Sequence, residues 1–108
     1  MSEIGVTQGY NGTVVQARVN DTVSIELPEN PTTGFRWTCE EGGATVISRI
    51  GDEFRMGTGS AMGQGGTRVF RFAAVRSGTA QVRCVLARAW EGGTARDSFG
   101  VQIAIQGR

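Results

Sequence analysis

Short runs in which apolar and polar residues alternate recur along the chain, and they constrain its fold more than any other feature. Residues 22–27, 67–75 and 98–106 are the clearest of these runs. A period of two places every second side chain on one face, which is the pattern of a half-buried strand. No long stretch has the period of an amphipathic helix. The sequence therefore predicts an all-β protein.

Turn signals such as Asn11-Gly12 and Arg76-Ser77-Gly78 separate the runs at intervals of about eight to twelve residues. Seven to eight strands joined in this way predict an immunoglobulin-like β-sandwich. A chain of 108 residues can bury a core of its own. Residues 1–108 are therefore expected to form a single domain. The predicted strands cover residues 4–7 (a short edge strand), 13–19, 22–27, 35–39, 44–50, 67–75, 79–88 and 98–106.

Both cysteines are expected to point into the core. Cys39 is in phase with Phe35 and Trp37, and Cys84 is in phase with Val82 and Leu86. Free buried thiols are the default expectation for the pair. A disulfide is the alternative if the two strands are neighbours, and it would indicate an oxidising compartment. The other side chains predicted to face inward are Val23, Ile25, Leu27, Val46, Phe99, Val101, Ile103 and Ile105.

Composition argues against several function classes. The net charge is +1, and the arginines are spaced singly along the chain, which gives nucleic-acid binding little support. Histidine is absent, which removes the commonest general base and the usual zinc ligand. The acidic pairs Glu40-Glu41 and Asp52-Glu53 are typical of solvated turns. We therefore expect no catalytic residue, no metal and no cofactor.

No stretch approaches the length needed to span a membrane, so no membrane partner is expected. The first eight residues lack the basic and apolar segments of an export signal. The compartment stays open, because a mature periplasmic or secreted form that has received a starter methionine has the same appearance. Nothing in the sequence calls for more than a monomer.

The stretch Asn30-Pro31-Thr32-Thr33-Gly34-Phe35 connects two predicted strands and is longer than a simple hairpin turn. Asn before Pro disfavours the helical region, Pro31 fixes one backbone angle, and Gly34 can supply a positive one. The loop is therefore expected to hold its shape and to expose Thr32 and Thr33. Taken alone, it could equally be an ordinary connection.

Two more segments are candidate functional loops. Residues 51–66 are rich in Gly and poor in core-forming residues, so we predict a long loop there whose functional part is about 57–66 and ends in Gly63-Gln64-Gly65-Gly66. Residues 88–95 begin with Arg88-Ala89-Trp90, and an exposed tryptophan in a loop suggests a binding contact. The alternatives are a flexible connector and a lid on the core. If connections alternate between the two ends of the sandwich, all three loops share one end.

These three loops, in this order, resemble the signatures of the chagasin family of protein inhibitors of papain-like cysteine peptidases. The resemblance spans roughly Thr13 to the C-terminus, and it departs from the family pattern at Ala89, where a proline is usual. It implies tight, reversible, non-covalent inhibition by residues 30–35, placed in the catalytic cleft with Thr32 and Thr33 against the reactive cysteine and histidine. The same resemblance implies that residues 63–66 approach the enzyme closely and that Trp90 is an anchor. Arg88 then supports Trp90 or pairs with an enzyme carboxylate.

Two rival interpretations come from other classes. The first is an immunoglobulin-like adhesion or carbohydrate-binding module, because one fold serves many functions. A carbohydrate binder should present several aromatic residues on one exposed face, whereas only Trp90 and Tyr10 are available here. The second is an enzyme, against which the missing histidine counts. The expected partner remains a papain-like cysteine peptidase.

Overall fold

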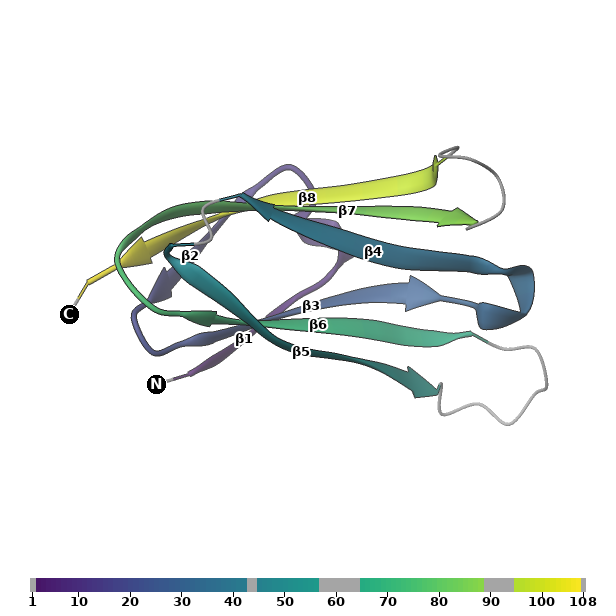
Figure 1. Cartoon of the computed structure of the whole chain (residues 1–108), viewed down its shortest axis with the longest axis horizontal. Coiled ribbons are helices and arrows are strands. Elements are labelled where there is room, and N and C mark those ends of the chain that lie inside the picture. Colours follow the sequence, from purple (N-terminus) through teal and green to yellow (C-terminus); the bar gives the residue numbers. More distant parts are fainter. Residues whose placement is uncertain (1, 43–44, 57–64, 89–94, 108) are drawn as a thin grey trace.

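The structure is a computed structural model that describes residues 2–42, 45–56, 65–88 and 95–107. Two four-stranded sheets pack face to face, with strand orders β1-β3-β6-β5 and β2-β8-β7-β4 (Figure 1). The predicted all-β sandwich and its strand number are therefore confirmed. Two short 3-10 turns, η1 (Gln8–Tyr10) and η2 (Pro31–Thr33), lie between strands. The strands are β1 (Glu3–Val6), β2 (Val14–Arg18), β3 (Thr22–Glu29), β4 (Phe35–Gly42), β5 (Ile47–Met56), β6 (Gly66–Ala74), β7 (Gly78–Arg88) and β8 (Ala95–Gln106).

The N-terminal part of the chain supplies one strand to each sheet. β1 pairs in parallel with β3, and β2 pairs in parallel with β8, while the other neighbours are antiparallel. β1 lies at a sheet edge, as the short strand predicted at residues 4–7 should. These two parallel pairings could not be foreseen from alternation, because alternation does not specify a partner.

The core lies between the sheets and is built from the predicted inward faces. Val23, Ile25 and Leu27 of β3 are fully buried, and Trp37 of β4 is 2% exposed. Side chains from the two inner faces interdigitate and exclude water, which supplies most of the stabilisation of a sandwich. The remaining predicted inward residues Val46, Cys39, Cys84, Val82, Phe99, Val101, Ile103 and Ile105 are also buried, and Leu86 is partly buried against the same cluster.

The prediction for residues 44–66 is partly wrong. The strand begins at Ile47 and continues to Met56, so residues 51–56 are not a loop. Within the described residues, β5 is an edge strand whose one neighbour is β6. Most of its side chains are solvent-exposed, so it needs few apolar residues. Its register also shifts between Arg49 and Gly51, which interrupts the alternation that sequence reasoning relies on.

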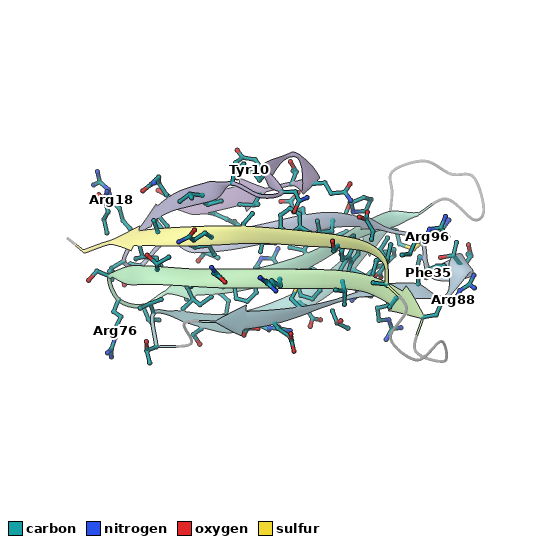
Figure 2. All side chains as sticks on the ribbon, turned by 90° about the horizontal axis from the view of Figure 1, so that it is seen from above. Tyr10, Arg18, Phe35, Arg76, Arg88 and Arg96 are labelled. Atoms are coloured by element: carbon teal, nitrogen blue, oxygen red, sulfur yellow. A yellow bond between two sulfur atoms is a disulfide. The ribbon has the colours of Figure 1, made fainter. Side chains whose placement is uncertain are left out.

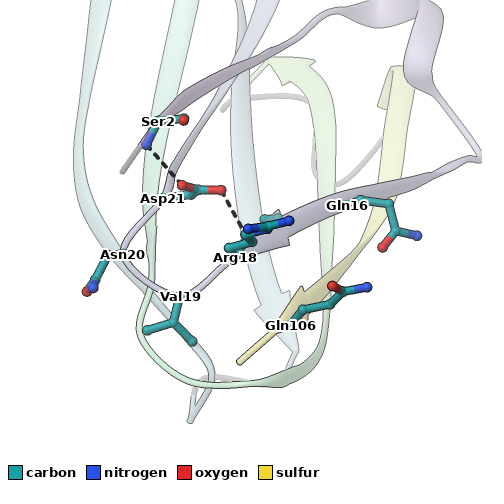
Figure 3. A pocket seen from close by; sticks show the side chains of 8 residues that line it. Ser2, Gln16, Arg18, Val19, Asn20, Asp21 and Gln106 are labelled. Carbon is teal, nitrogen blue, oxygen red and sulfur yellow. Dashed lines mark hydrogen bonds between the residues drawn. The ribbon is translucent and has the colours of Figure 1, made fainter. Parts of the chain in front are cut away.

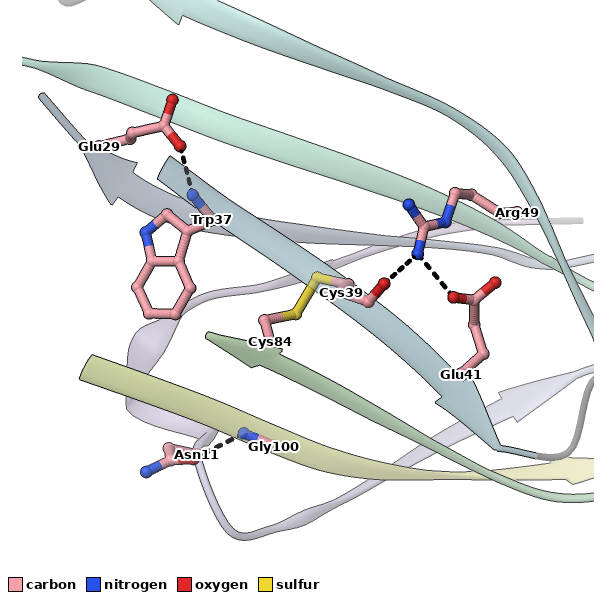
Figure 4. Close-up of a disulfide and its surroundings, with 8 residues drawn as sticks. All are labelled: Asn11, Glu29, Trp37, Cys39, Glu41, Arg49, Cys84 and Gly100. Carbon is pink, nitrogen blue, oxygen red and sulfur yellow. Dashed lines mark hydrogen bonds and ion pairs between the residues drawn. A yellow bond between two sulfur atoms is a disulfide. The ribbon is translucent and has the colours of Figure 1, made fainter. Parts of the chain in front are cut away.

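The default expectation for the cysteines is also wrong, because Cys39 and Cys84 form a disulfide (Figure 4). The two residues lie directly opposite each other in β4 and β7, with their Cα atoms 4.0 Å apart. Such close approach suits a pair that faces across two strands without exchanging backbone hydrogen bonds. The alternative expectation, a disulfide between neighbouring strands, is therefore confirmed.

The strand register brings the ends of several strands to one end of the sandwich, called here the loop end. Glu29, the last residue of β3, and Met56, the last of β5, both lie opposite Gly66. Phe35, the first residue of β4, lies opposite Arg88, the last of β7. The connections that follow β3, β5 and β7 therefore leave from the same end, while the two chain termini lie at the other (Figure 1).

Candidate functional site

Residues 30–34 form a compact turn at the loop end that is braced by its own side chains. Oδ1 of Asn30 accepts hydrogen bonds from the Thr32 backbone N–H (3.1 Å) and hydroxyl (2.7 Å). The Asn30 carbonyl accepts from the Thr33 backbone N–H (3.1 Å) and hydroxyl (2.7 Å). Asn30 therefore caps the 3-10 turn as it would cap a helix. Both threonine hydroxyls are held in place before any partner arrives.

The turn closes at Gly34, whose φ of 81° is left-handed. This is the positive angle that glycine adopts without a steric penalty. The Gly34 N–H donates to the Pro31 carbonyl at 3.1 Å, and the Phe35 N–H donates to the Thr33 hydroxyl at 3.3 Å. Pro31, Thr32 and Thr33 remain solvent-exposed. The expectation of an ordered loop with exposed threonines is confirmed.

A buried carboxylate fastens the base of the turn. The Glu29 side chain is buried, with 4% of the residue exposed. Its Oε2 atom accepts a hydrogen bond from the Trp37 backbone N–H at 2.7 Å. Its Oε1 atom accepts from Arg68 Nε (3.1 Å) and Nη2 (2.8 Å). The Trp37 indole N–H donates to the Pro28 carbonyl at 2.7 Å. The Glu29–Trp37 hydrogen bond ties the two ends of the turn together (Figure 4). The bonds from Arg68 tie Glu29 to β6. Sequence reasoning missed Glu29, although it is in phase with Leu27 and so points inward.

Two guanidinium groups gather at the ring of Phe35. The Cζ atom of Arg88 lies 4.3 Å from the ring centroid, and that of Arg96 lies 4.9 Å from it. Arg88 Nε also donates to the Thr33 carbonyl at 3.0 Å. Figure 2 places these three residues together at the loop end. Arg88 therefore supports the 30–34 turn directly. Arg96 belongs to the same group, although none of the sequence motifs includes it.

Two glycines of the second motif pack against the chain itself. A Cβ on Gly65 would lie 2.8 Å from the Glu29 carbonyl, and one on Gly66 would lie 2.0 Å from the Arg55 carbonyl. Their lack of a side chain is thus required by the fold. A cavity of about 390 Å³ lies beside them, lined by residues that include Asn30, Phe35 and Gly65. The other motif residues Gly63, Gln64, Ala89 and Trp90 lie outside the described residues.

A larger hollow of about 910 Å³ lies at the opposite end (Figure 3). Asp21, one of its lining residues, accepts from the Ser2 N–H (2.9 Å) through Oδ1 and from the Arg18 N–H (2.9 Å) through Oδ2. Its carboxylate is therefore used to hold a turn. In the described ranges, no three His, Cys, Asp or Glu side chains are grouped to hold a metal ion. Nor does any helix in the described chain have the length and apolar character needed to cross a membrane.

The loop end thus presents an exposed turn braced by internal hydrogen bonds, with two arginines at the neighbouring Phe35 ring. The family model described as "Chagasin family peptidase inhibitor I42" matches residues 16–103. This chain belongs to the chagasin family of peptidase inhibitors. It is 32% identical to chagasin from Trypanosoma cruzi over 91 residues, covering 81% of this chain and 83% of that protein.

Solved structures support the same fold for this chagasin-family chain. The cysteine protease inhibitor EhICP2 from Entamoeba histolytica has a TM-score of 0.89 at 22% identity, covering 98% of this chain and 97% of that one. PbICP-C, solved in complex with falcipain-2, has a TM-score of 0.60 at 12% identity, covering 98% and 89%. The family resemblance read from the three motifs is confirmed.

Proposed function

We propose that this chain is a tight, reversible, non-covalent inhibitor of papain-like cysteine peptidases and not an enzyme. It belongs to a family of peptidase inhibitors, and similar proteins include one named as a cysteine protease inhibitor and one solved in complex with falcipain-2. The observation that carries the proposal is the 30–34 turn, which is exposed yet braced by internal hydrogen bonds.

The 30–34 turn is proposed to enter the catalytic cleft and exclude substrate. It loses little conformational entropy on binding, because Asn30 and Gly34 already fix its shape. It also offers no peptide bond in a geometry ready for attack, since its backbone is folded into a 3-10 turn and its N–H groups are already bonded. The reactive cysteine would therefore be covered without the inhibitor being cleaved.

Residues 57–66 and 88–95 are proposed to contact the peptidase on either side of the cleft. In this arrangement Thr32 and Thr33 lie against the reactive cysteine and histidine, and Trp90 is a large anchor of the kind that dominates protein interfaces. Ala89 in place of proline leaves that third loop with one fewer backbone restraint.

The proposal is tested by titrating papain with the protein and measuring the remaining activity. We expect activity to disappear near one-to-one stoichiometry and the inhibitor to be recovered intact. Thr32→Arg and Thr33→Arg should each weaken inhibition at least about 100-fold, because a long charged side chain cannot be accommodated in a filled cleft. Thr79→Arg, an exposed position on β7 near the other end, is the matched control and should inhibit normally.

One result of the titration would contradict the proposal. If papain and a cathepsin-like peptidase both keep full activity at micromolar protein, the chain is not an inhibitor of this class. The sandwich would then have to be screened as a general binding module.

A further inference from the structure

Arg96, the second residue of β8, is an exposed cation at the loop end that the motifs do not include. Its guanidinium lies over the ring of Phe35, 4.9 Å from the centroid. In the described part of the chain, no hydrogen bond or ion pair is formed by its side chain. The group is therefore placed by the ring and not by an acidic partner.

A cation–π contact with a ring does not use up the N–H donors of a guanidinium. The group is planar, and its five N–H donors lie in the plane, where they match the two oxygens of a carboxylate. The Arg96 guanidinium is thus held at the ring with its N–H donors available for a bidentate contact with an anion. Holding the group at the ring lowers the entropy that such a contact would otherwise cost.

Two acidic side chains are already engaged, that of Glu29, which lines the same cavity as Arg96, and that of Asp97, the next residue in the chain. Glu29 is buried and bonded to Arg68. Asp97 accepts from the Gln8 side-chain amide at 3.1 Å and from the Ser98 N–H at 2.8 Å. Arg88 shares the Phe35 ring with Arg96. The described side chains around the ring therefore present positive charge to a partner.

We propose that Arg96 is a specificity-determining residue of the inhibitory surface, where it binds a carboxylate of the target peptidase. This inference rests on the proposed function. It assigns to the preferred target an acidic side chain on the rim of the cleft, next to the position that Phe35 occupies in the complex. Peptidases without that acidic side chain are bound more slowly and more weakly.

A charge at the rim of an interface acts mainly on the association rate. Attraction between Arg96 and an acidic rim steers the two proteins together, and dissolved salt screens it over about 10 Å. The contribution of Arg96 should therefore be largest at low ionic strength.

The test is stopped-flow association with whichever of papain and a cathepsin-like peptidase the parent inhibits more tightly, at about 20 mM and about 300 mM NaCl. Arg96→Gln should slow association on the order of fivefold at low salt, and the difference should shrink at high salt. Arg76→Gln is the matched control, because it removes the same charge from an exposed residue at the far end (Figure 2). It should change the rate less than about twofold.

The inference is overturned if Arg96→Gln associates like Arg76→Gln at both salt concentrations. It is also overturned if the loss is the same at both, since a salt-independent loss means that Arg96 only supports the Phe35 ring. Arg96→Lys separates the two roles further, because it keeps the charge and loses the planar edge. If the parent inhibits neither peptidase, the proposed function itself fails, and Arg96 loses its role with it.

Discussion

At Glu29, one side chain links the fold to the candidate site. A carboxylate taken out of water costs several kcal/mol unless it is paired and hydrogen-bonded. Here Arg68 supplies two donors and the Trp37 backbone a third, so all of the buried charge is used to hold the base of the 30–34 turn. The same residue therefore bears on the stability of the fold and on the shape of the turn that is proposed to inhibit.

We expect Glu29→Gln to lower the free energy of unfolding by about 2 kcal/mol. Neutralising the carboxylate leaves Arg68 without its counter-charge. The loss of stability should be smaller than for a fully buried ion pair, because the Arg68 side chain is 17% exposed to solvent. Urea denaturation measures the change, and a papain titration should show weaker inhibition. Glu53→Gln, in an exposed pair, is the control and should lower stability clearly less than Glu29→Gln does. Equal losses for both variants would contradict the role given to Glu29.

Gly66 and Gly51 make a matched pair of glycines on neighbouring strands. Gly66→Ala should destabilise the protein by about 2 kcal/mol, because its Cβ would collide with the Arg55 carbonyl and the backbone must move. Gly51→Ala should be neutral or slightly stabilising, since nothing lies within 4 Å of the added Cβ and its φ is not positive. Urea midpoints of the two variants check this, and a neutral Gly66→Ala would show that β5 and β6 are not so closely paired there.

At the scale of a single element, the β1-β3-β6-β5 sheet carries a polar ladder on its outer face. Arg71 of β6 pairs with Glu53 of β5 at 2.8 Å and with Glu3 of β1 at 3.6 Å, and Ser24 of β3 donates to Glu3 at 2.5 Å. The hydrogen bond from Ser24, together with Arg71, lowers the pKa of Glu3. Hydrogen bonds from Arg71 and Arg55 lower the pKa of Glu53. All four strands of the sheet contribute to this ladder.

The ladder predicts how stability falls in acid. Because both carboxyls have a folded pKa below their ordinary value of 4.5, they stabilise the fold above pH 4.5, and this contribution is lost as the pH falls below that value. Melting temperatures between about pH 6 and about pH 3 measure it. A Glu3→Gln/Glu53→Gln double variant should lose less stability over that range than the parent. A control, Glu40→Gln/Asp52→Asn, removes two carboxylates with no ion pair among the described residues and should keep the parent's slope.

At the scale of the whole molecule, the two sheets are secured by different means. The polar ladder crosses one sheet, and the Cys39–Cys84 disulfide joins two strands of the other. β4 begins directly after the 30–34 turn and β7 ends at Arg88, so the disulfide links the strands that carry the first and third motifs. It lies in the core and not at the loop end.

Removing the disulfide should lower the free energy of unfolding by about 3 to 4 kcal/mol. A bond between residues 45 apart in sequence restricts the unfolded chain, and this loop length gives a value of that order. Urea curves of the protein with and without dithiothreitol measure the difference. The Cys39→Ala/Cys84→Ala variant is the control and should not respond to the reductant. Overlapping curves for the parent, with no free thiol in the unfolded oxidised protein, would contradict the prediction.

Much of the fold and part of the site could be predicted from the sequence because they depend on neighbours along the chain. Alternation alone identified the buried face of β3 and the inward direction of both cysteines. The chemistry of Asn, Pro and Gly within five residues predicted an ordered, exposed turn at 30–34. Three short motifs in order were sufficient to recognise the family.

Other features depend on contacts between strands that are distant in the sequence. The extension of β5 to Met56, the bond between Cys39 and Cys84, and the partners of Glu29 all follow from strand register. The same is true of the two arginines at Phe35 and of the collision that excludes a side chain at Gly66. A period of two tells which face a side chain occupies and nothing about which strand lies beside it. Register comes from packing the whole sandwich at once, and it places the residues that support the candidate site.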